Sequence, residues 1–228
     1  MRNPAAAAPS VTLAVDVISD VVCPWCYIGK RKLEAALGDL KVREPELDVA
    51  VRWHPFQLNP DMPEGGMPRA SYLAAKFGGG ARAAEIYSRV RAVGIEVGIP
   101  FAFERIAMQP NTLQAHRLIA WAQARGGLDA ASVLVERLFH AYFIDGAFLG
   151  DRDELVRVAG MAGFDQAEAR AMLASDEGSD TVEAEDREAR SVGIQGVPFF
   201  IFNGRIAVSG AHDQPTLLDA IDAARQAH

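Results

Sequence analysis

Cysteines are few in this sequence, and so are basic residues and long apolar runs. Two cysteines among 228 residues cannot form the multi-bridge framework that stabilises small secreted domains. No apolar run approaches the ~20 residues that a membrane-spanning helix needs. Lys and Arg total 23 against 30 Asp and Glu, and the net charge of -7 disfavours nucleic acid and anionic membranes as partners. Half of the residues are hydrophobic and 23% are charged, which is ordinary globular composition.

The length of 228 residues favours one domain, or one domain that carries a large insertion. Residues 1–9 hold one basic residue and an alanine tract between two prolines, without the hydrophobic segment of a signal peptide. We therefore expect a flexible N-terminal segment at residues 1–9 and a cytoplasmic protein. In a reducing cytosol, a close pair of cysteines more often handles metal or electrons than braces a fold.

Both cysteines lie where a strand pattern changes into a helix pattern. Residues 11–18 are rich in valine, which predicts a buried strand. Pro24 directly follows Cys23, and proline is tolerated in the first turn of a helix but little further in. Apolar residues then continue at helical spacing as far as Gly38. We therefore expect Cys23 at the N-terminus of a helix that also carries Cys26.

A second strand is expected at residues 47–53, where apolar and polar residues alternate. From about residue 71 to residue 192 the chain changes character, and apolar residues recur at the spacing of one helix after another. One of these helical segments should end at the glycine pair 126–127, and Asp151 and Asp165 resemble helix N-caps.

Strand character returns near the end of the chain. Residues 199–202 and 206–209 are short apolar segments on either side of Asn203-Gly204, which is a strong dipeptide signal for a β-hairpin. Asp213 should then cap a last helix. When the long helical block is removed, a small mixed sheet flanked by helices remains, so the block is expected to interrupt an α/β domain.

The position of the two cysteines indicates redox chemistry. A thiolate rather than a thiol attacks a disulfide, and the free amides and peptide dipoles of a helix N-terminus favour an anion. We therefore expect Cys23 to be the more exposed nucleophile, and Cys26, one turn further along, to be the buried resolving thiol. The alternatives are an inert buried pair and a zinc site. Zinc is disfavoured, and no metal is expected, because a structural site usually has four ligands and no histidine shows a ligand spacing.

Three segments resemble the DsbA-like thioredoxin superfamily, and most closely its cytoplasmic FrnE-like branch, whose active-site motif is CPWC. They are residues 19–34 (SDVVCPWCYIGKRKLE), 53–61 (WHPFQLNPD) and 196–212 (GVPFFIFNGRIAVSGAH). The resemblance covers essentially the whole chain and implies an α/β, thioredoxin-like fold with a large all-helical insertion. The thioredoxin-like domain would then comprise residues 10–60 and 193–228, with an inserted helical domain at residues 61–192.

The resemblance also implies which residues form the reaction centre. Val197-Pro198 matches the family's cis-proline beside the cysteines, and its turn would leave the Val197 backbone free to pair with an extended substrate segment. Pro24 and Trp25 lie between the cysteines, where Trp25 would either cover the disulfide and contact substrate or simply pack. The Pro-Trp pair lacks the histidine of periplasmic CPHC enzymes, which implies a milder oxidant.

Further candidate residues each have a structural alternative. His54, Phe56 and Asn59 match a stretch shared with chromene-carboxylate isomerases and kappa-class glutathione transferases, so they are expected to line the substrate pocket. A histidine at a strand end is, however, more often structural. Asn111 is a helix cap first and a pocket residue second. Asp20 would either relay a proton for the cysteines or cap the turn before them.

The function implied by this resemblance is that of a thiol–disulfide oxidoreductase. It would exchange disulfides with protein or peptide substrates through a mixed disulfide at Cys23, which Cys26 resolves. No cofactor is expected beyond the Cys23–Cys26 disulfide, with glutathione as an optional co-substrate and a monomer or homodimer as the assembly. One alternative is a glutathione-dependent isomerase or transferase of the 2-hydroxychromene-2-carboxylate isomerase or kappa-class type. The other is a redox-sensing, chaperone-like module that binds peptides.

Overall fold

A four-stranded mixed sheet organises the protein, with its strands in the order β2-β1-β5-β6. The computed structural model describes residues 12–226, so the flexible segment predicted at residues 1–9 lies outside the described residues. The strands are β1 (Thr12–Ser19), β2 (Asp48–Pro55), β5 (Phe199–Phe202) and β6 (Ile206–Ser209). β1 pairs in parallel with β2 and antiparallel with β5, which pairs antiparallel with β6.

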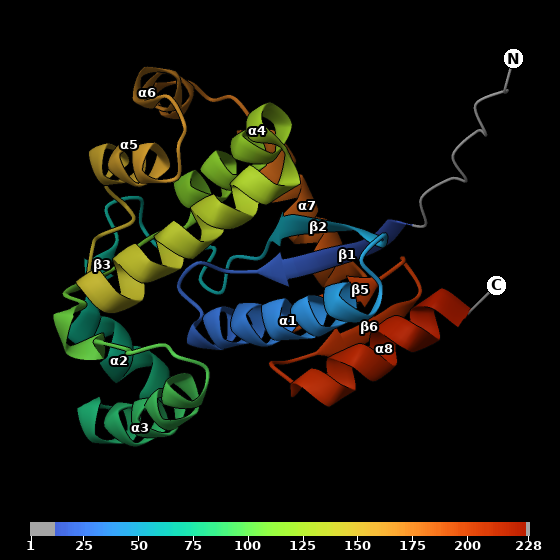
Figure 1. Ribbon diagram of the computed structural model, residues 1–228. Helices are drawn as coiled ribbons and strands as arrows, with labels where there is room; N and C mark the ends of the chain where they lie inside the picture. The colour runs from blue at the N-terminus through green and yellow to red at the C-terminus, as the bar shows by residue number, and fades with distance from the viewer. Residues whose placement is uncertain (1–11, 227–228) are drawn as a thin grey trace, which may run out of the picture.

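Helices cover both faces of this sheet, as Figure 1 shows. On one face, α1 (Pro24–Arg43) and α8 (Gln214–Gln226) lie side by side, and on the other face α7 (Ser179–Ser191) packs against β2. The central strand β1 is therefore buried on both sides. Val15 and Val17 belong to the main core, whereas Ile18 packs with Ala189 of α7 in a second apolar cluster. Burial on both faces explains why β1 is so rich in apolar residues.

A block of helices lies between β2 and β5 in the chain. It contains α2 (Arg69–Phe77), α3 (Gly80–Glu96), α4 (Leu113–His140), α5 (Arg152–Met161), α6 (Gln166–Ala174) and α7. A 3-10 turn η1 (Phe103–Arg105) and a π-helical turn η2 (Ala141–Asp145) complete it, together with the two-residue strands β3 (Met67–Pro68) and β4 (Met108–Gln109). The predicted helical block therefore also contains one small antiparallel ladder.

The long helix α4 joins this block to the sheet (Figure 1), because it contacts β2 as well as α5, α6 and α7. The side-chain amide of Gln123 exchanges two hydrogen bonds with the backbone of Trp53 on the edge strand β2, at 2.8 and 3.0 Å. Trp53 Nε1 also donates to Ser132 Oγ at 2.9 Å. The break predicted at residues 126–127 is present inside α4 as a non-helical Gly127, whose φ of 82° suits glycine. None of the described helices is long and apolar enough to cross a membrane.

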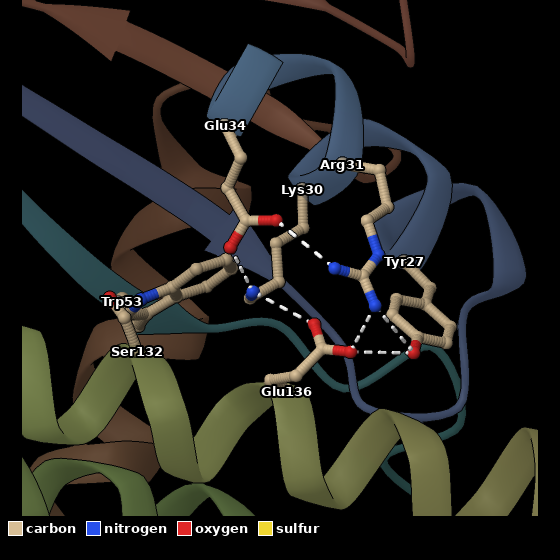
Figure 2. A network of polar contacts seen from close by, with 7 residues as sticks. All are labelled: Tyr27, Lys30, Arg31, Glu34, Trp53, Ser132 and Glu136. Atoms are coloured by element: carbon tan, nitrogen blue, oxygen red, sulfur yellow. Dashed lines mark hydrogen bonds and ion pairs between the residues drawn. The ribbon is translucent and has the colours of Figure 1, made fainter. Parts of the chain in front are cut away.

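A polar network ties α4 to α1, the helix that carries the cysteines (Figure 2). Glu136 of α4 accepts hydrogen bonds from Tyr27 Oη at 2.7 Å, Lys30 Nζ at 2.9 Å and Arg31 Nη2 at 2.5 Å. Lys30 also forms an ion pair with Glu34, and its side chain is almost completely buried. The network holds Tyr27, the residue after Cys26, against the helical block.

Two elements extend beyond their predicted ends. α1 continues past Gly38 to Arg43, because Leu40 is buried in the core and its burial outweighs the cost of about 1 kcal/mol for a glycine within a helix. β2 includes Pro55, which pairs with Ser19. Since β2 lies at the edge of the sheet, a proline without an N–H group breaks no ladder on its free side.

The predicted turn and caps are confirmed. Asn203 and Gly204 both have positive φ, 50° and 64°, in the turn between β5 and β6, as a hairpin of this kind requires. The side chains of Asp151, Asp165 and Asp213 accept hydrogen bonds from backbone amides in the first turns of α5, α6 and α8.

Candidate active site

Cys23 is the N-cap residue of α1, and Pro24 begins the helix. The Cys23 backbone is extended, with φ -93° and ψ 112°, and its carbonyl oxygen accepts hydrogen bonds from the amides of Cys26 at 3.0 Å and Tyr27 at 3.3 Å. No side chain caps this helix end, and no acidic residue lies in its first turn. The free amides and the helix dipole therefore favour negative charge here. Trp25, between the cysteines, is 38% exposed and offers an apolar surface.

Cys23 meets the segment that leads into β5. The Val197–Pro198 peptide bond is cis, as the resemblance implied. The Cys23 thiol donates a hydrogen bond to the Val197 carbonyl oxygen, with 3.5 Å between sulfur and oxygen. No backbone–backbone hydrogen bond within residues 12–226 involves Val197. Within these residues its amide is thus free of backbone partners, and its carbonyl accepts only the Cys23 thiol, so this backbone can pair with an extended segment of a substrate.

Cys26 lies deeper than Cys23, with 1% of its surface exposed against 5%. Burial raises the pKa of the Cys26 thiol well above its usual value, and the neighbouring Cys23 thiol acts in the same direction. The Asp20 backbone and the Ser19 side chain, which lie beside the Cys26 thiol, act to lower its pKa. Both thiols are free. No group of three or more His, Cys, Asp or Glu side chains among the described residues is placed to hold a metal ion.

Asp20 is fully buried in the turn between β1 and α1. Its carboxylate accepts hydrogen bonds from the backbone amides of Leu58 at 2.8 Å and Val22 at 3.4 Å, and its carbonyl accepts one from Cys23 at 3.0 Å. Asp20 therefore caps the turn before the cysteines and ties this turn to the loop after β2. The same carboxylate lies 3.5 Å from Nε2 of His116 on α4.

Leu58, whose amide is hydrogen-bonded to Asp20, lines a cavity of about 470 Å³. The loop after β2 and helix α2 form its walls, which include Asn59, Met62, Tyr72 and Lys76. Asn59 Oδ1 accepts a hydrogen bond from Lys76 Nζ at 3.3 Å, whereas Asn59 Nδ2 is buried without a partner. The predicted site residue Asn59 thus lines open space beside the cysteine turn.

His54 and Phe56 are held by other side chains. His54 Nε2 lies 3.0 Å from the carboxylate of Asp16, and Nδ1 lies 3.3 Å from that of Glu185. Glu185 first and Asp16 second raise the pKa of His54 against the effect of burial. Phe56 is 2% exposed, and the Arg190 guanidinium lies 4.2 Å from its ring centroid. The structure therefore places Phe56 in the core, and the contacts of His54 match its structural alternative.

Asn111 braces two backbone segments. Its Oδ1 accepts a hydrogen bond from the Leu113 amide at 2.9 Å at the start of α4, which is the capping role considered for it. Its Nδ2 donates to the Met62 carbonyl at 2.7 Å. Asn111 therefore supports the loop that forms one wall of the 470 Å³ cavity, since Met62 lines that cavity.

Gly29 is a site residue that the sequence interpretation missed. A Cβ atom at this position would lie 2.8 Å from Pro198 Cγ and 3.1 Å from Phe200 Cζ. Only glycine therefore lets α1 approach the cis-proline this closely. The available signal was a glycine inside a predicted helix, three residues after Cys26, because such a glycine costs helix stability and usually has a packing reason.

Comparison with known proteins identifies relatives along nearly the whole chain. The DSBA-like thioredoxin domain family matches residues 14–222. The uncharacterized protein YwbO of Bacillus subtilis (strain 168) is 26% identical over 216 residues, which are 92% of this chain and 96% of that protein.

Two solved structures share this arrangement of strands and helices. A probable DsbA oxidoreductase from Streptomyces coelicolor has a TM-score of 0.83 and 31% sequence identity, covering 95% of this chain and 91% of that chain. The cytosolic disulfide reductase DsbM from Pseudomonas aeruginosa, solved with GSH, has a TM-score of 0.58 and 22% identity, covering 93% and 95% of the two chains. These structures confirm the predicted thioredoxin-like fold with a helical insertion.

Proposed function

This chain belongs to the DSBA-like thioredoxin domain family, and from that membership we propose that it is a protein thiol–disulfide oxidoreductase acting through Cys23 and Cys26. The observation that supports this most directly is the position of Cys23 at the free N-terminus of α1, within 3.5 Å of the Val197 carbonyl oxygen. The CPWC sequence of residues 23–26 favours the FrnE-like branch and a cytoplasmic location, both of which stay predictions.

The reaction proceeds in two exchanges. The Cys23 thiolate attacks one sulfur of a substrate disulfide, which forms a Cys23–substrate disulfide and releases the other substrate sulfur as a thiolate. Cys26 then loses its proton and attacks Cys23, which forms the Cys23–Cys26 disulfide and releases the second substrate thiolate. The substrate gains two electrons and the protein loses two. With a reduced substrate and an oxidised protein, the same steps run in reverse.

The substrate segment is expected to extend from Val197 toward the 470 Å³ cavity. The Val197 backbone supplies hydrogen bonds to an extended peptide, and Trp25 supplies apolar contact beside the sulfur. The Lys76 ammonium on the cavity wall can donate hydrogen bonds to carbonyl or carboxylate oxygens. This chemistry suits a peptide, and it also suits glutathione, which is itself a peptide thiol and which the similar DsbM structure contains.

A reduction assay tests the proposed function. We expect the purified protein to catalyse the dithiol-dependent reduction of insulin, and Cys23→Ala to abolish this activity. Cys26→Ser should accumulate mixed disulfides with the substrate, visible as a mass increase that a reductant removes. A wild-type protein that leaves insulin disulfides intact but conjugates glutathione to an electrophile would instead be a transferase. Stoichiometric peptide binding that survives Cys23→Ala, without either activity, would identify a binding module.

A further inference from the structure

One buried histidine close to the cysteines lacks a hydrogen bond. His116 on α4 is 4% exposed, and its Nε2 atom is buried with no hydrogen-bond partner. That atom lies 3.5 Å from Asp20 Oδ1, a distance suited to an ion pair when the imidazole is protonated. Buried polar atoms are normally paired, so an exception next to a reaction centre calls for a reason. The pair of His116 Nε2 and Asp20 Oδ1 is an ion pair only when the imidazole carries a proton.

A second cavity connects this histidine with the resolving cysteine. The cavity measures about 400 Å³ and lies between β2, α4 and α7, and its walls include Ser19, His54, His116 and Glu185. Ser19 is the important neighbour, because its side chain lies beside the Cys26 thiol and acts to lower the pKa of that thiol. Ser19, beside Cys26, and His116, beside Asp20, therefore line one cavity. It is large enough to hold several water molecules.

The chemistry of Cys26 requires a proton acceptor. A buried thiol with a raised pKa must lose its proton before it can attack the mixed disulfide. Tyr142 of η2 cannot serve, because burial raises its pKa far above neutrality. His54, on β2 across the cavity, is already engaged by Asp16 and Glu185. Of the other titratable wall residues, Arg52 is a cation and Glu185 is paired with His54, which leaves His116, whose Nε2 lies 3.5 Å from the Asp20 carboxylate.

We propose that His116, oriented by Asp20, accepts the proton of Cys26 by way of the Ser19 hydroxyl and the cavity that Ser19 and His116 share. This proposal rests on the proposed function and assigns the proton transfer of its second exchange. As Cys26 attacks Cys23, the Cys26 proton passes to Ser19, and the Ser19 proton passes across the cavity to His116. Ser19 is unchanged at the end, and the imidazolium beside Asp20 later loses its proton to water in the cavity.

The same path serves the opposite direction. When a substrate thiolate attacks Cys23 of the oxidised pair, the Cys23–Cys26 bond breaks and Cys26 receives the electron pair as a thiolate. Protonated His116 then returns a proton through Ser19, so that the leaving sulfur departs as a thiol. Asp20 acts on the sulfur only through His116 and is a positioning residue. The helical block thus supplies a group for the chemistry as well as shape around Cys23.

A two-phase reaction with 5,5′-dithiobis(2-nitrobenzoate) separates the two exchanges. Attack by Cys23 releases one nitrothiolate at a rate proportional to reagent concentration, and resolution by Cys26 releases a second at a rate independent of it. We expect His116→Ala to slow the second phase about 100-fold, the lower end of the usual range for general-base catalysis, and to leave the first phase within twofold. Adding imidazole, which fits the vacated cavity, should restore much of the second-phase rate.

Matched variants separate proton transfer from packing. Ile119 lines the same cavity one helical turn from His116, so Ile119→Ala removes comparable packing without removing a base. Both phases of Ile119→Ala should stay within threefold of wild type, with or without imidazole. His116→Gln keeps most of the side-chain bulk and should show the slow second phase of His116→Ala. Asp20→Asn should slow the second phase about tenfold, and this deficit should shrink as pH rises and hydroxide replaces the base.

The outcomes distinguish the two proposals. A second phase in His116→Ala or His116→Gln that matches Ile119→Ala would overturn the role of His116, even when the wild-type protein shows both phases. A slow second phase in His116→Ala that added imidazole does not accelerate would also contradict the role of His116 as proton acceptor. A wild-type protein without a first phase would instead refute the proposed function, because Cys23 would then not be a nucleophile.

Discussion

The two sulfurs of the candidate active site have different surroundings. On what we call the front side, Cys23 contacts the Val197 carbonyl beside the partly exposed Trp25. On the rear side, Cys26 is buried against Ser19 and the Asp20 backbone, with α4 behind them. The front side has free backbone groups and an apolar surface, whereas the rear side has titratable groups around a cavity. Under the two proposals above, the front side meets the substrate and the rear side transfers the proton of Cys26.

The largest expected difference between the two sides is in thiol reactivity. At pH 7 the native reduced protein should be alkylated by iodoacetamide at Cys23 about 100-fold faster than at Cys26, because burial raises the pKa of Cys26 and little of its surface is accessible. The rates are measured by mass spectrometry on Cys26→Ser and Cys23→Ser, which each retain one thiol. Equal alkylation rates in the two variants would show that Cys26 is no less reactive than Cys23 and would contradict the difference between the two sides.

The front side should be easiest to break at Gly29. Because a Cβ atom there would meet Pro198 Cγ at 2.8 Å, Gly29→Val must push α1 away from the cis-proline. We expect a loss of about 3 kcal/mol in the free energy of unfolding, typical of overpacking, and an insulin reduction rate about tenfold lower. Gly38→Val is the matched control, since nothing lies within 4 Å of a Cβ atom there. Equal losses in the free energy of unfolding for Gly29→Val and Gly38→Val would show that close packing against Pro198 does not cause the destabilisation.

The front side was largely predictable from the sequence, because its information is local. Pro24 restricts the start of the helix to the residues next to it. The valine-rich segment that precedes Cys23 predicts a buried strand, so the helix must begin at the end of that strand. The Val197-Pro198 pair was assigned only through family resemblance, since a single proline before a strand does not by itself predict a cis peptide bond. The role of Gly29 could not be predicted from its neighbours in the sequence. Its role depends on the distance to a residue 169 positions away, which follows from pairing between β1 and β5.

The rear side could not be predicted, because its residues come together only through packing of the helical block. His116 lies inside an apolar helix pattern, where a histidine is usually a core residue, and no motif connects it to Asp20. The assignments of His54 and Phe56 to the substrate pocket came from a shared stretch rather than from geometry. They are two residues apart at the end of β2, so strand pleating places both side chains on the face that α7 covers. There His54 meets Asp16 and Glu185, and Phe56 packs with Ile18 and Ala189.

The rear side should depend on the network that attaches α4 to α1. Glu136→Gln removes the charge that pairs with Lys30 and Arg31, and the nearly buried Lys30 keeps only Glu34 as an ionic partner. We expect a loss of about 2 kcal/mol in the free energy of unfolding, measured with urea. The control Glu85→Gln breaks an exposed pair with Arg89 and should cost less than about 0.5 kcal/mol. A similar cost for both would mean that the network in Figure 2 does not secure α4.

The smallest expected effect is a pH dependence of stability that comes from His54, on the wall of the rear cavity. Glu185 and Asp16 raise the pKa of His54 above its unfolded value of about 6.5, so the protonated form stabilises the folded protein. That contribution is fully present below pH 6.5 and is lost as the pH rises through the raised value. His54→Gln should therefore destabilise the protein by about 0.5 kcal/mol at pH 5.5 in urea unfolding and by less at pH 8.5. A deficit that grows with pH would mean that His54 is bound as the neutral imidazole, and its ion pairs would then not explain its position.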